Sequence, residues 1–347
     1  MRAVQYSEFG GEIEIRDVAV PSVPPDGALI RVEATGLCRS DWHGWVGHDP
    51  DIQLPHVPGH EFAGIIAAVG PSVTGWRPGA RVTFPFIGAC GACPSCLAGA
   101  ETVCDSQDQP GFNRWGSFAE FVAITRADVN LIALPEELDS VTAAALGCRF
   151  ATAYRAVMAQ GRAREGEWVA VHGCGGVGLS SVMIAIAAGA RVVAIDVSPI
   201  ALAAAGALGA EVLIDARDPD VTTAIDVATD GGVHLSLDAL GSTETCLNSI
   251  ASLRRRGRHV QAGLMVGADA RPPIPMNRVL SRELELIGSH GMAPHDYREM
   301  LARVADGRLR PDRLVGRTIS LEATPEALMA MSGPPTVAGM TVILPAP

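Results

Sequence analysis

The sequence predicts an α/β fold joined to a mainly β domain, and two patterns along the chain carry this prediction. Between residues 167 and 289, apolar strand-like runs alternate with Ala-rich helical stretches, which is typical of βαβ units and a parallel sheet. The first 150 residues instead hold short β-branched runs separated by Gly and Pro, the pattern of an irregular, mainly antiparallel β domain. A chain of 347 residues is long enough for two such domains.

The β-rich part is expected to contain four strands, at residues 28–32, 62–69, 80–84 and 118–124. The alternating part predicts six more, at residues 168–172, 191–196, 211–216, 234–240, 258–264 and 283–289, and six is the strand count of a full dinucleotide-binding sheet. Beyond residue 289 we expect helices near 296–305 and 325–331 and strands at 315–321 and 340–344, in a tail that returns to the first domain. The predicted domains are therefore 1–152 together with 290–347, and 153–289.

Composition excludes several function classes. The formal net charge is −11, with no long basic run, so there is no electrostatic footprint for nucleic acid or anionic lipid. The short run Arg254, Arg255 and Arg256 is interpreted as the end of a helix. No uninterrupted apolar stretch reaches about 18 residues, and the N-terminus has no apolar signal region, so we expect no membrane span and a cytoplasmic location.

The segment HGCGGVG predicts a dinucleotide site, because it follows one predicted strand and opens a helix. Its glycines allow a tight turn and let backbone N–H groups approach a pyrophosphate at the helix N-terminus. Asp196 ends the next strand, where a carboxylate bonds ribose hydroxyls and repels a 2′-phosphate, which favours NAD over NADP. The alternative is a Gly-rich turn with an incidental Asp. The candidate cofactor residues here are Gly173, Gly175, Gly176, Val177, Gly178 and Asp196.

Four of the eight cysteines lie in one short segment, as Cys90, Cys93, Cys96 and Cys104. At this spacing they can surround one tetrahedral ion and leave no open position, which predicts a structural zinc. A disulfide pair is disfavoured in a reducing compartment. A nucleic-acid-binding zinc ribbon is disfavoured too, because residues 84–108 contain no Lys or Arg.

Three other positions form a candidate catalytic set. Cys38 and His60 stand in Gly-flanked turns, Glu61 follows His60, and Cys148 adds a second thiol. Two Cys and one His are the ligands of a catalytic zinc whose fourth position is left for water or substrate. Taken singly, each residue is as consistent with an ordinary buried position.

Together, the segments GLCRSDWH, GHE, the four cysteines, Cys148 with Thr152, and the glycine turn resemble the zinc-dependent alcohol dehydrogenases of the medium-chain dehydrogenase/reductase superfamily. The resemblance covers nearly the whole chain and implies a GroES-like catalytic domain with a Rossmann NAD-binding domain. It implies that Cys38, His60 and Cys148 hold a catalytic zinc, with Glu61 behind it as an occasional ligand. It further implies roles for other residues: Asp41 bonds His60, Ser40 and His43 relay a proton, Thr152 packs on the nicotinamide, Phe86 lines the substrate pocket, and Arg39 lies near the pyrophosphate.

The expected function is an NAD-linked interconversion of alcohols with aldehydes or ketones, using two zinc ions per subunit in a homo-oligomer, a tetramer or a dimer. The alternatives are a zinc-free double-bond or quinone reductase and a non-catalytic binding protein on the same scaffold. Two positions depart from the family pattern. Ala201 stands where relatives place a basic residue for the adenosine ribose, and Met340 stands where many have an Arg for the pyrophosphate.

Overall fold

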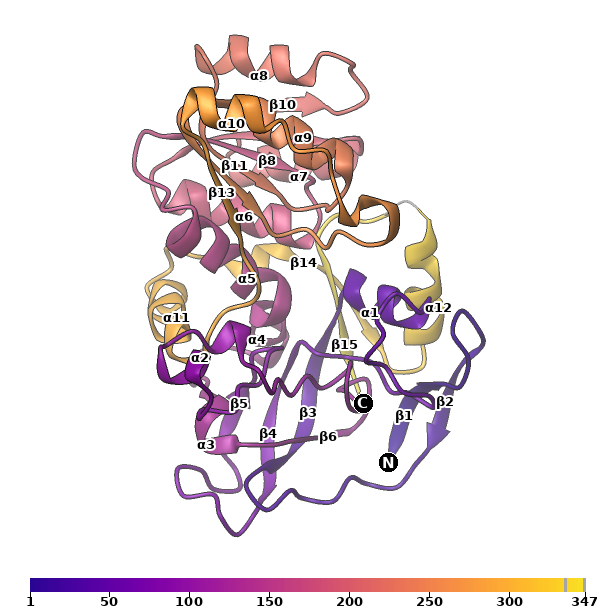
Figure 1. The fold of residues 1–347 in the computed structure, drawn as a ribbon. Helices are drawn as coiled ribbons and strands as arrows, with labels where there is room; N and C mark the ends of the chain where they lie inside the picture. The colour runs from indigo at the N-terminus through magenta and orange to yellow at the C-terminus, as the bar shows by residue number, and fades with distance from the viewer. Residues whose placement is uncertain (334–335, 346–347) are drawn as a thin grey trace.

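The computed structural model describes residues 1–333 and 336–345 and contains two large sheets and a hairpin. Figure 1 shows the parallel sheet with its helices in the upper part and the β-rich part below it. The largest cluster of buried apolar residues spans both parts, from Ala34 and Ala63 through Leu146 and Phe150 to Val171. One continuous core therefore fixes the ligand-bearing turns of the β-rich part against the glycine turn of the parallel sheet.

The parallel sheet confirms the prediction of a six-stranded Rossmann arrangement. Its order is β10-β9-β8-β11-β12-β13, and every neighbouring pair is parallel. The dinucleotide crevice of such a sheet lies at the carboxyl ends of the strands, where the order reverses beside β8. The strands are β8 (Trp168–His172), β9 (Arg191–Asp196), β10 (Val212–Asp215), β11 (Val233–Asp238), β12 (Leu253–Gln261) and β13 (Glu285–Gly288).

Helices connect these strands, and their ends follow local sequence signals. Ser198 caps one helix by accepting a hydrogen bond from the Ala201 N–H, and Gly209 ends it in the left-handed conformation. Ser242 and Thr245 form a capping box on another. The helices are α6 (Gly176–Ala187), α7 (Pro199–Leu208), α8 (Val221–Thr229), α9 (Thr243–Ala251) and α10 (Met276–Arg282).

The interpretation of the three consecutive arginines as a helix end is wrong. Helix α9 ends at Ala251, and Arg254, Arg255 and Arg256 lie within β12. Arg256 adopts a left-handed φ of 59°, and the pairing of β11 with β12 shifts register between Val233 and Leu235. The strand is therefore irregular where the arginines stand, which hides it from a periodicity analysis.

The β-rich sheet has the order β14-β15-β3-β4-β5-β7, with β6 paired to β3. The tail does return to this part, because β15 pairs antiparallel with β3 (Figure 1). A hairpin of β1 and β2 and the two-residue β7 are strands that the sequence analysis missed. The strands are β1 (Arg2–Tyr6), β2 (Ile13–Asp17), β3 (Ala28–Leu37), β4 (Phe62–Val69), β5 (Arg81–Thr83), β6 (Phe121–Ile124), β7 (Ile132–Ala133), β14 (Val315–Ser320) and β15 (Met340–Leu344).

Short helices complete this part and the tail: α1 (Arg39–Trp45), α2 (Pro94–Leu97), α3 (Ala127–Asn130), α4 (Ser140–Ala145), α5 (Ala151–Tyr154), α11 (Tyr297–Ala305) and α12 (Thr324–Met329). Wide π-helical turns at Leu146–Phe150 and Arg155–Gln160 flank α5. Turns of this kind are frequent at functional sites. Within the described part of the chain, no helix combines the length and apolar character needed to cross a membrane.

Candidate active site and metal centres

Four potential metal ligands converge between the two parts of the molecule. Cys38 follows β3 and caps α1, His60 and Glu61 precede β4, and Cys148 lies on the π-helical turn that follows α4. One ligand atom from each of the four lies within 4.8 Å of the others. The Nε2 atom of His60 is buried and has no hydrogen-bond partner among the described residues. A buried imidazole nitrogen left free beside two thiols and a carboxylate fits zinc, which binds this donor set.

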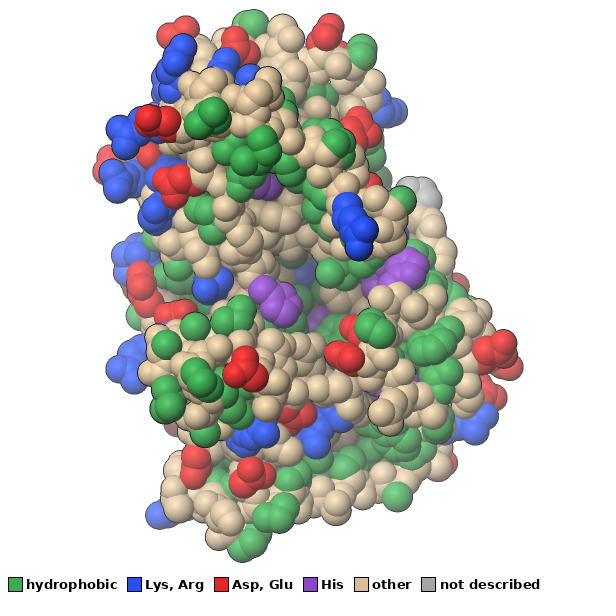
Figure 2. Space-filling model, in the orientation of Figure 1, with side chains coloured by type: hydrophobic (Ala, Val, Ile, Leu, Met, Phe, Trp, Pro, Cys, Tyr) green, Lys and Arg blue, Asp and Glu red, His purple; other side chains and the backbone are tan. Residues whose placement is uncertain are grey.

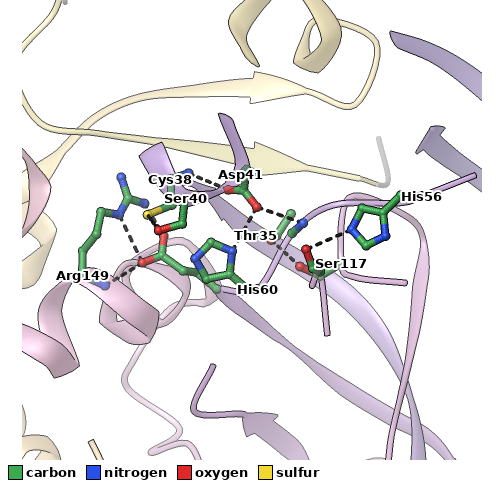
Figure 3. Close-up of polar contacts among 11 residues, drawn as sticks. Thr35, Cys38, Ser40, Asp41, His56, His60, Ser117 and Arg149 are labelled. Atoms are coloured by element: carbon green, nitrogen blue, oxygen red, sulfur yellow. Dashed lines mark hydrogen bonds and ion pairs between the residues drawn. The ribbon is translucent and has the colours of Figure 1, made fainter. Parts of the chain in front are cut away.

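Asp41 orients the two ligands nearest to it. Its carboxylate accepts hydrogen bonds from Cys38 N–H at 2.8 Å, from Gly59 N–H at 3.1 Å and from His60 Nδ1 at 2.9 Å. The bond to Nδ1 places the imidazole proton on that nitrogen and leaves the Nε2 lone pair directed into the cluster. Asp41 is 1% exposed, so water does not compete for its oxygens. Figure 3 shows Asp41 and Arg149 on opposite sides of Cys38 and His60.

Arg149, which the sequence did not single out, holds the carboxylate of Glu61. Its backbone N–H and its Nε donate to Glu61 Oε1 at 2.8 and 3.1 Å, and its Nη2 donates to Oε2 at 2.5 Å. Both side chains are buried. Burial raises the pKa of Glu61 and the Arg149 guanidinium opposes that rise. Glycine makes room for the pair, because a Cβ at Gly36 would collide with the Glu61 carboxylate.

Arg149 also touches the glycine turn of the parallel sheet. A Cβ at Gly176 would collide with the Arg149 side chain, so the stem of Arg149 runs against the first residue of α6. The only signal in the sequence was its place directly after Cys148. The arrangement puts one cation in contact with the candidate metal cluster and with the candidate phosphate turn.

A pair of histidines extends from the exposed side of α1. Ser40 Oγ lies 3.8 Å from Cys38 Sγ, and His43 stands one helical turn further along α1. His43 Nδ1 lies 2.8 Å from Nδ1 of the exposed His48, and Trp42 packs edge-on against both rings. Burial, His48 and Arg39 lower the pKa of His43 to about 4. His48 is a residue that the sequence alone did not single out.

The four clustered cysteines form a second set of ligands. Their sulfurs lie 3.5 to 3.9 Å apart in the pairs Cys90–Cys96, Cys93–Cys96 and Cys93–Cys104. These separations match the edge of a tetrahedron with Zn–S bonds of about 2.3 Å, which is about 3.8 Å. Backbone N–H groups of Ala92 and Cys93 lower the pKa of Cys90 to about 6. All four cysteines are free thiols, so the disulfide alternative finds no support.

The glycine turn has the geometry of a phosphate-binding loop. Gly173 follows β8 with φ of 90°, and Gly175 caps α6, whose first residues are Gly176, Val177 and Gly178. A Cβ at Gly178 would collide with the Gly173 carbonyl, so this position accepts only glycine. Asp196 at the end of β9 accepts hydrogen bonds from Cys174 N–H at 2.6 Å and Ser198 N–H at 2.7 Å. The turn and the acid are therefore tied together.

The remaining candidates line the same region or lie at its edge. Thr152 on α5 is buried, and its Oγ1 has no hydrogen-bond partner in the part of the chain that the structure describes. Phe86 packs edge-on against His60 in an apolar group with Ile52, Ile87 and Phe112. Arg39 lies 4.0 Å over the Trp42 ring and donates to the Met331 carbonyl. Figure 2 shows this face hollowed between the two parts, with His side chains along the hollow.

Comparison with known proteins agrees with this geometry. The alcohol dehydrogenase GroES-like domain matches residues 24–136, and the zinc-binding dehydrogenase domain matches residues 176–306. Alcohol dehydrogenases of Geobacillus stearothermophilus and Rhizobium meliloti (strain 1021) are 34% and 35% identical to the chain, covering 89% of it and 90% and 89% of the relatives.

Solved structures extend the likeness to the whole fold. An alcohol dehydrogenase from Thermus sp. ATN1 superposes with a TM-score of 0.89 at 32% identity, over 99% of both chains. A zinc-binding dehydrogenase from Sinorhizobium meliloti 1021 bound to NADP gives the same TM-score, identity and coverage. An NAD-dependent alcohol dehydrogenase matches over 100% of both chains at 31% identity, again with a TM-score of 0.89. The chain thus belongs to the zinc-type alcohol dehydrogenases of the medium-chain dehydrogenase/reductase superfamily, a conclusion that its sheets, its glycine turn and its relatives share.

Proposed function

We propose that the chain is a zinc-dependent dehydrogenase that interconverts alcohols with aldehydes or ketones by hydride transfer to or from NAD(H). The observation that carries this proposal is the convergence of Cys38, His60 and Cys148 between the two parts of the molecule, where the buried His60 Nε2 has no hydrogen-bond partner among the residues described. A zinc-free double-bond or quinone reductase needs no such ligand set.

The residues around this cluster support a division of roles. Cys38, His60 and Cys148 would hold a zinc ion, which when bound supplies a Lewis acid that stabilises negative charge on the substrate oxygen. Asp41 fixes the tautomer and orientation of His60. Arg149 neutralises Glu61 and holds its carboxylate through three hydrogen bonds, so Glu61 stays outside the resting ligand set. Phe86 supplies an apolar wall that excludes water from the substrate side.

Proton transfer is assigned to the histidine pair and Ser40. Ser40 takes the hydroxyl proton of the alcohol as it gives up its own, and His43 accepts the released proton because its lowered pKa keeps the imidazole neutral. In the His43–His48 hydrogen bond, the proton is placed on His43 Nδ1. When His43 accepts a second proton at Nε2, its Nδ1 proton can move to Nδ1 of His48. His48 is exposed and releases its Nε2 proton to water.

The cofactor is assigned to the crevice beside β8. The nicotinamide of NAD supplies the hydride acceptor, and Thr152, whose hydroxyl has no partner within the described ranges, would pack beside it. The glycine turn and the start of α6 would bind the pyrophosphate, and Arg149, which contacts Gly176, would supply a cation there in place of the Arg that is absent at Met340. Asp196 favours NAD, and the variant Asp196→Ser should lower the NAD/NADP ratio of kcat/KM.

The four-cysteine lobe would hold a second, structural zinc, because its ligand set is closed. We further propose a cytoplasmic homo-oligomer, with the exposed edge strand β13 available for pairing between subunits.

Metal content and turnover together test the proposal. Protein purified without added zinc should contain two zinc ions per chain, and alcohol-dependent NADH formation should stop after chelation. Cys148→Ser should retain one zinc ion and lose turnover. Cys246→Ser changes a buried cysteine outside both clusters and should keep both zinc ions and full turnover. One zinc with full activity would overturn the catalytic assignment and favour the double-bond reductase.

A further inference from the structure

A second polar hollow, of about 630 Å³, lies at the amino ends of β8, β11, β12 and β13. The dinucleotide turn is at the opposite, carboxyl end of β8, about 17 Å away for a five-residue strand. The chain as a whole carries a net charge of −11, yet the hollow is basic. In Figure 2, Arg side chains gather with some acidic ones along the upper left edge of the molecule. The hollow is lined by Arg162, Arg164, Arg254, Arg255, Arg256, Arg258, His234, Glu167, Glu283 and Glu285.

Ion pairs neutralise only half of these arginines. Arg258 pairs with Glu167 at 2.6 Å, Arg162 with Glu285, and Arg256 with Glu283 at 3.8 Å. The structure gives no carboxylate partner to Arg164, Arg254 or Arg255 within the described ranges. Six arginines against three glutamates leave an excess of three positive charges in one concave site.

His234 and Arg254 face each other with two hydrogen-bond donors. His234 Nδ1 accepts a hydrogen bond from Trp168 N–H at 3.0 Å, so the ring proton of the neutral imidazole is on Nε2. That Nε2 lies 2.8 Å from Arg254 Nη1, which is always a donor. Burial and Arg254 lower the pKa of His234, so the imidazole stays neutral. Two donors at this distance are stabilised by an acceptor that both can reach.

Arg258 supplies another unmet donor. The side chain is buried at 8% exposure, and its Nε has no acceptor within the part of the chain that the structure describes. Its other nitrogens bind Glu167 and the Arg162 carbonyl. A buried guanidinium with a free N–H, which lines a basic hollow, is a site for an anion.

We propose that this hollow binds an oligophosphate, either inorganic or the phosphate chain of a nucleotide. Arginine forks match phosphate oxygens in bidentate geometry, and at least three negative charges are needed to balance the excess in the hollow. The site is independent of the proposed catalytic function, because none of its residues lies at either cysteine cluster or at the glycine turn.

Inorganic tripolyphosphate tests the proposal by titration calorimetry on the full chain at constant ionic strength. Because the glycine turn can also bind this anion, only the binding lost in a variant is assigned to the hollow. The double variant Arg164→Gln with Arg255→Gln removes two exposed, unpaired arginines and should weaken that binding by at least about tenfold. Its control, Arg77→Gln with Arg271→Gln, makes the same charge change on exposed side chains elsewhere and should have no effect.

Repeating the titration with ATP identifies the source of the phosphate chain. Tighter binding of ATP than of tripolyphosphate, with the same loss in the double variant, supports a nucleotide ligand, and weaker binding supports an inorganic one. Binding of both anions that is unchanged in the double variant would overturn the proposal. So would loss of self-association in the double variant without loss of anion binding, which would assign the hollow to a protein partner.

Discussion

Replacement of Asp41 by Asn should weaken the candidate metal site and the fold together, by an amount that the contacts define. The carboxylate accepts three hydrogen bonds while 1% exposed, from Cys38 N–H, Gly59 N–H and His60 Nδ1. An amide has one acceptor oxygen, which can keep Gly59 and His60, but its NH2 group then faces the Cys38 N–H. An orphaned buried donor costs about 1–3 kcal/mol, and two bonds to a neutral acceptor each lose about 1 kcal/mol. The expected destabilisation is about 3–5 kcal/mol.

Calorimetry and a zinc competition assay check this prediction. The melting temperature should fall by at least about 5 °C, and competition with a chromophoric chelator should show about 10–100-fold weaker binding of one zinc. The four-cysteine site provides an internal reference that should not change. Asp128→Asn is the matched control, because Asp128 also accepts three hydrogen bonds, from Thr74 and Gly75, but is exposed. Equal effects of the two substitutions, or full zinc retention in Asp41→Asn, would refute the reasoning.

Three further variants test the candidate site. Arg149→Met leaves the fully buried Glu61 unpaired and should lower the free energy of unfolding by about 3–5 kcal/mol. Adding Glu61→Gln to the same chain should restore most of this loss. A calorimetric double-mutant cycle that finds no coupling between the two positions would contradict this prediction. Burial already raises the pKa of Glu61 above 4.5, so the stability it contributes is present in acid and lost as pH rises, and the penalty of Arg149→Met should grow from pH 5 to pH 8. His48→Gln removes the second of the causes that lower the pKa of His43 to about 4, so the acid limb of the pH profile of kcat/KM for alcohol oxidation should move to higher pH. An unmoved limb would show that His48 does not lower the pKa of His43. Cys93→Ser should lower the zinc content by one ion and speed proteolysis within residues 90–104, and retention of both ions would show that the four sulfurs do not share a metal.

The fold was predictable wherever burial leaves a regular pattern of apolar residues in the sequence. The inner strands β8, β9 and β11 are buried along nearly their whole length and read as apolar runs. The edge strands β10 and β13 are more exposed, and they were found because helical stretches alternate with strands along this part of the chain. The hairpin of β1 and β2 was missed because its strands are five residues each and β2 is mostly half-buried or exposed. The start of β12 was misread as a helix end because the strand there is irregular and carries three arginines.

In the candidate site, the residues that belong to local sequence motifs were predictable, and those that meet only through long-range contacts were not. The spacing of cysteines and of glycines along the chain indicates metal ligands and a dinucleotide turn, so the two thiol clusters and the turn could be proposed from the sequence. The Glu61–Arg149 pair joins positions 88 residues apart, and the contact of Arg149 with Gly176 joins a π-helical turn to the start of α6, so no local pattern encodes either. The sequence lacks the family Arg at position 340, where Met340 is 1% exposed in β15 and packs in the core. Arg149, which a buried carboxylate anchors, instead brings a cation into contact with the candidate phosphate turn. Because that carboxylate adjoins the metal ligands, loss of Arg149 should both weaken cofactor binding and disturb the metal site. If one cation contacted the phosphate turn and a different one paired with Glu61, a single substitution would not have both effects.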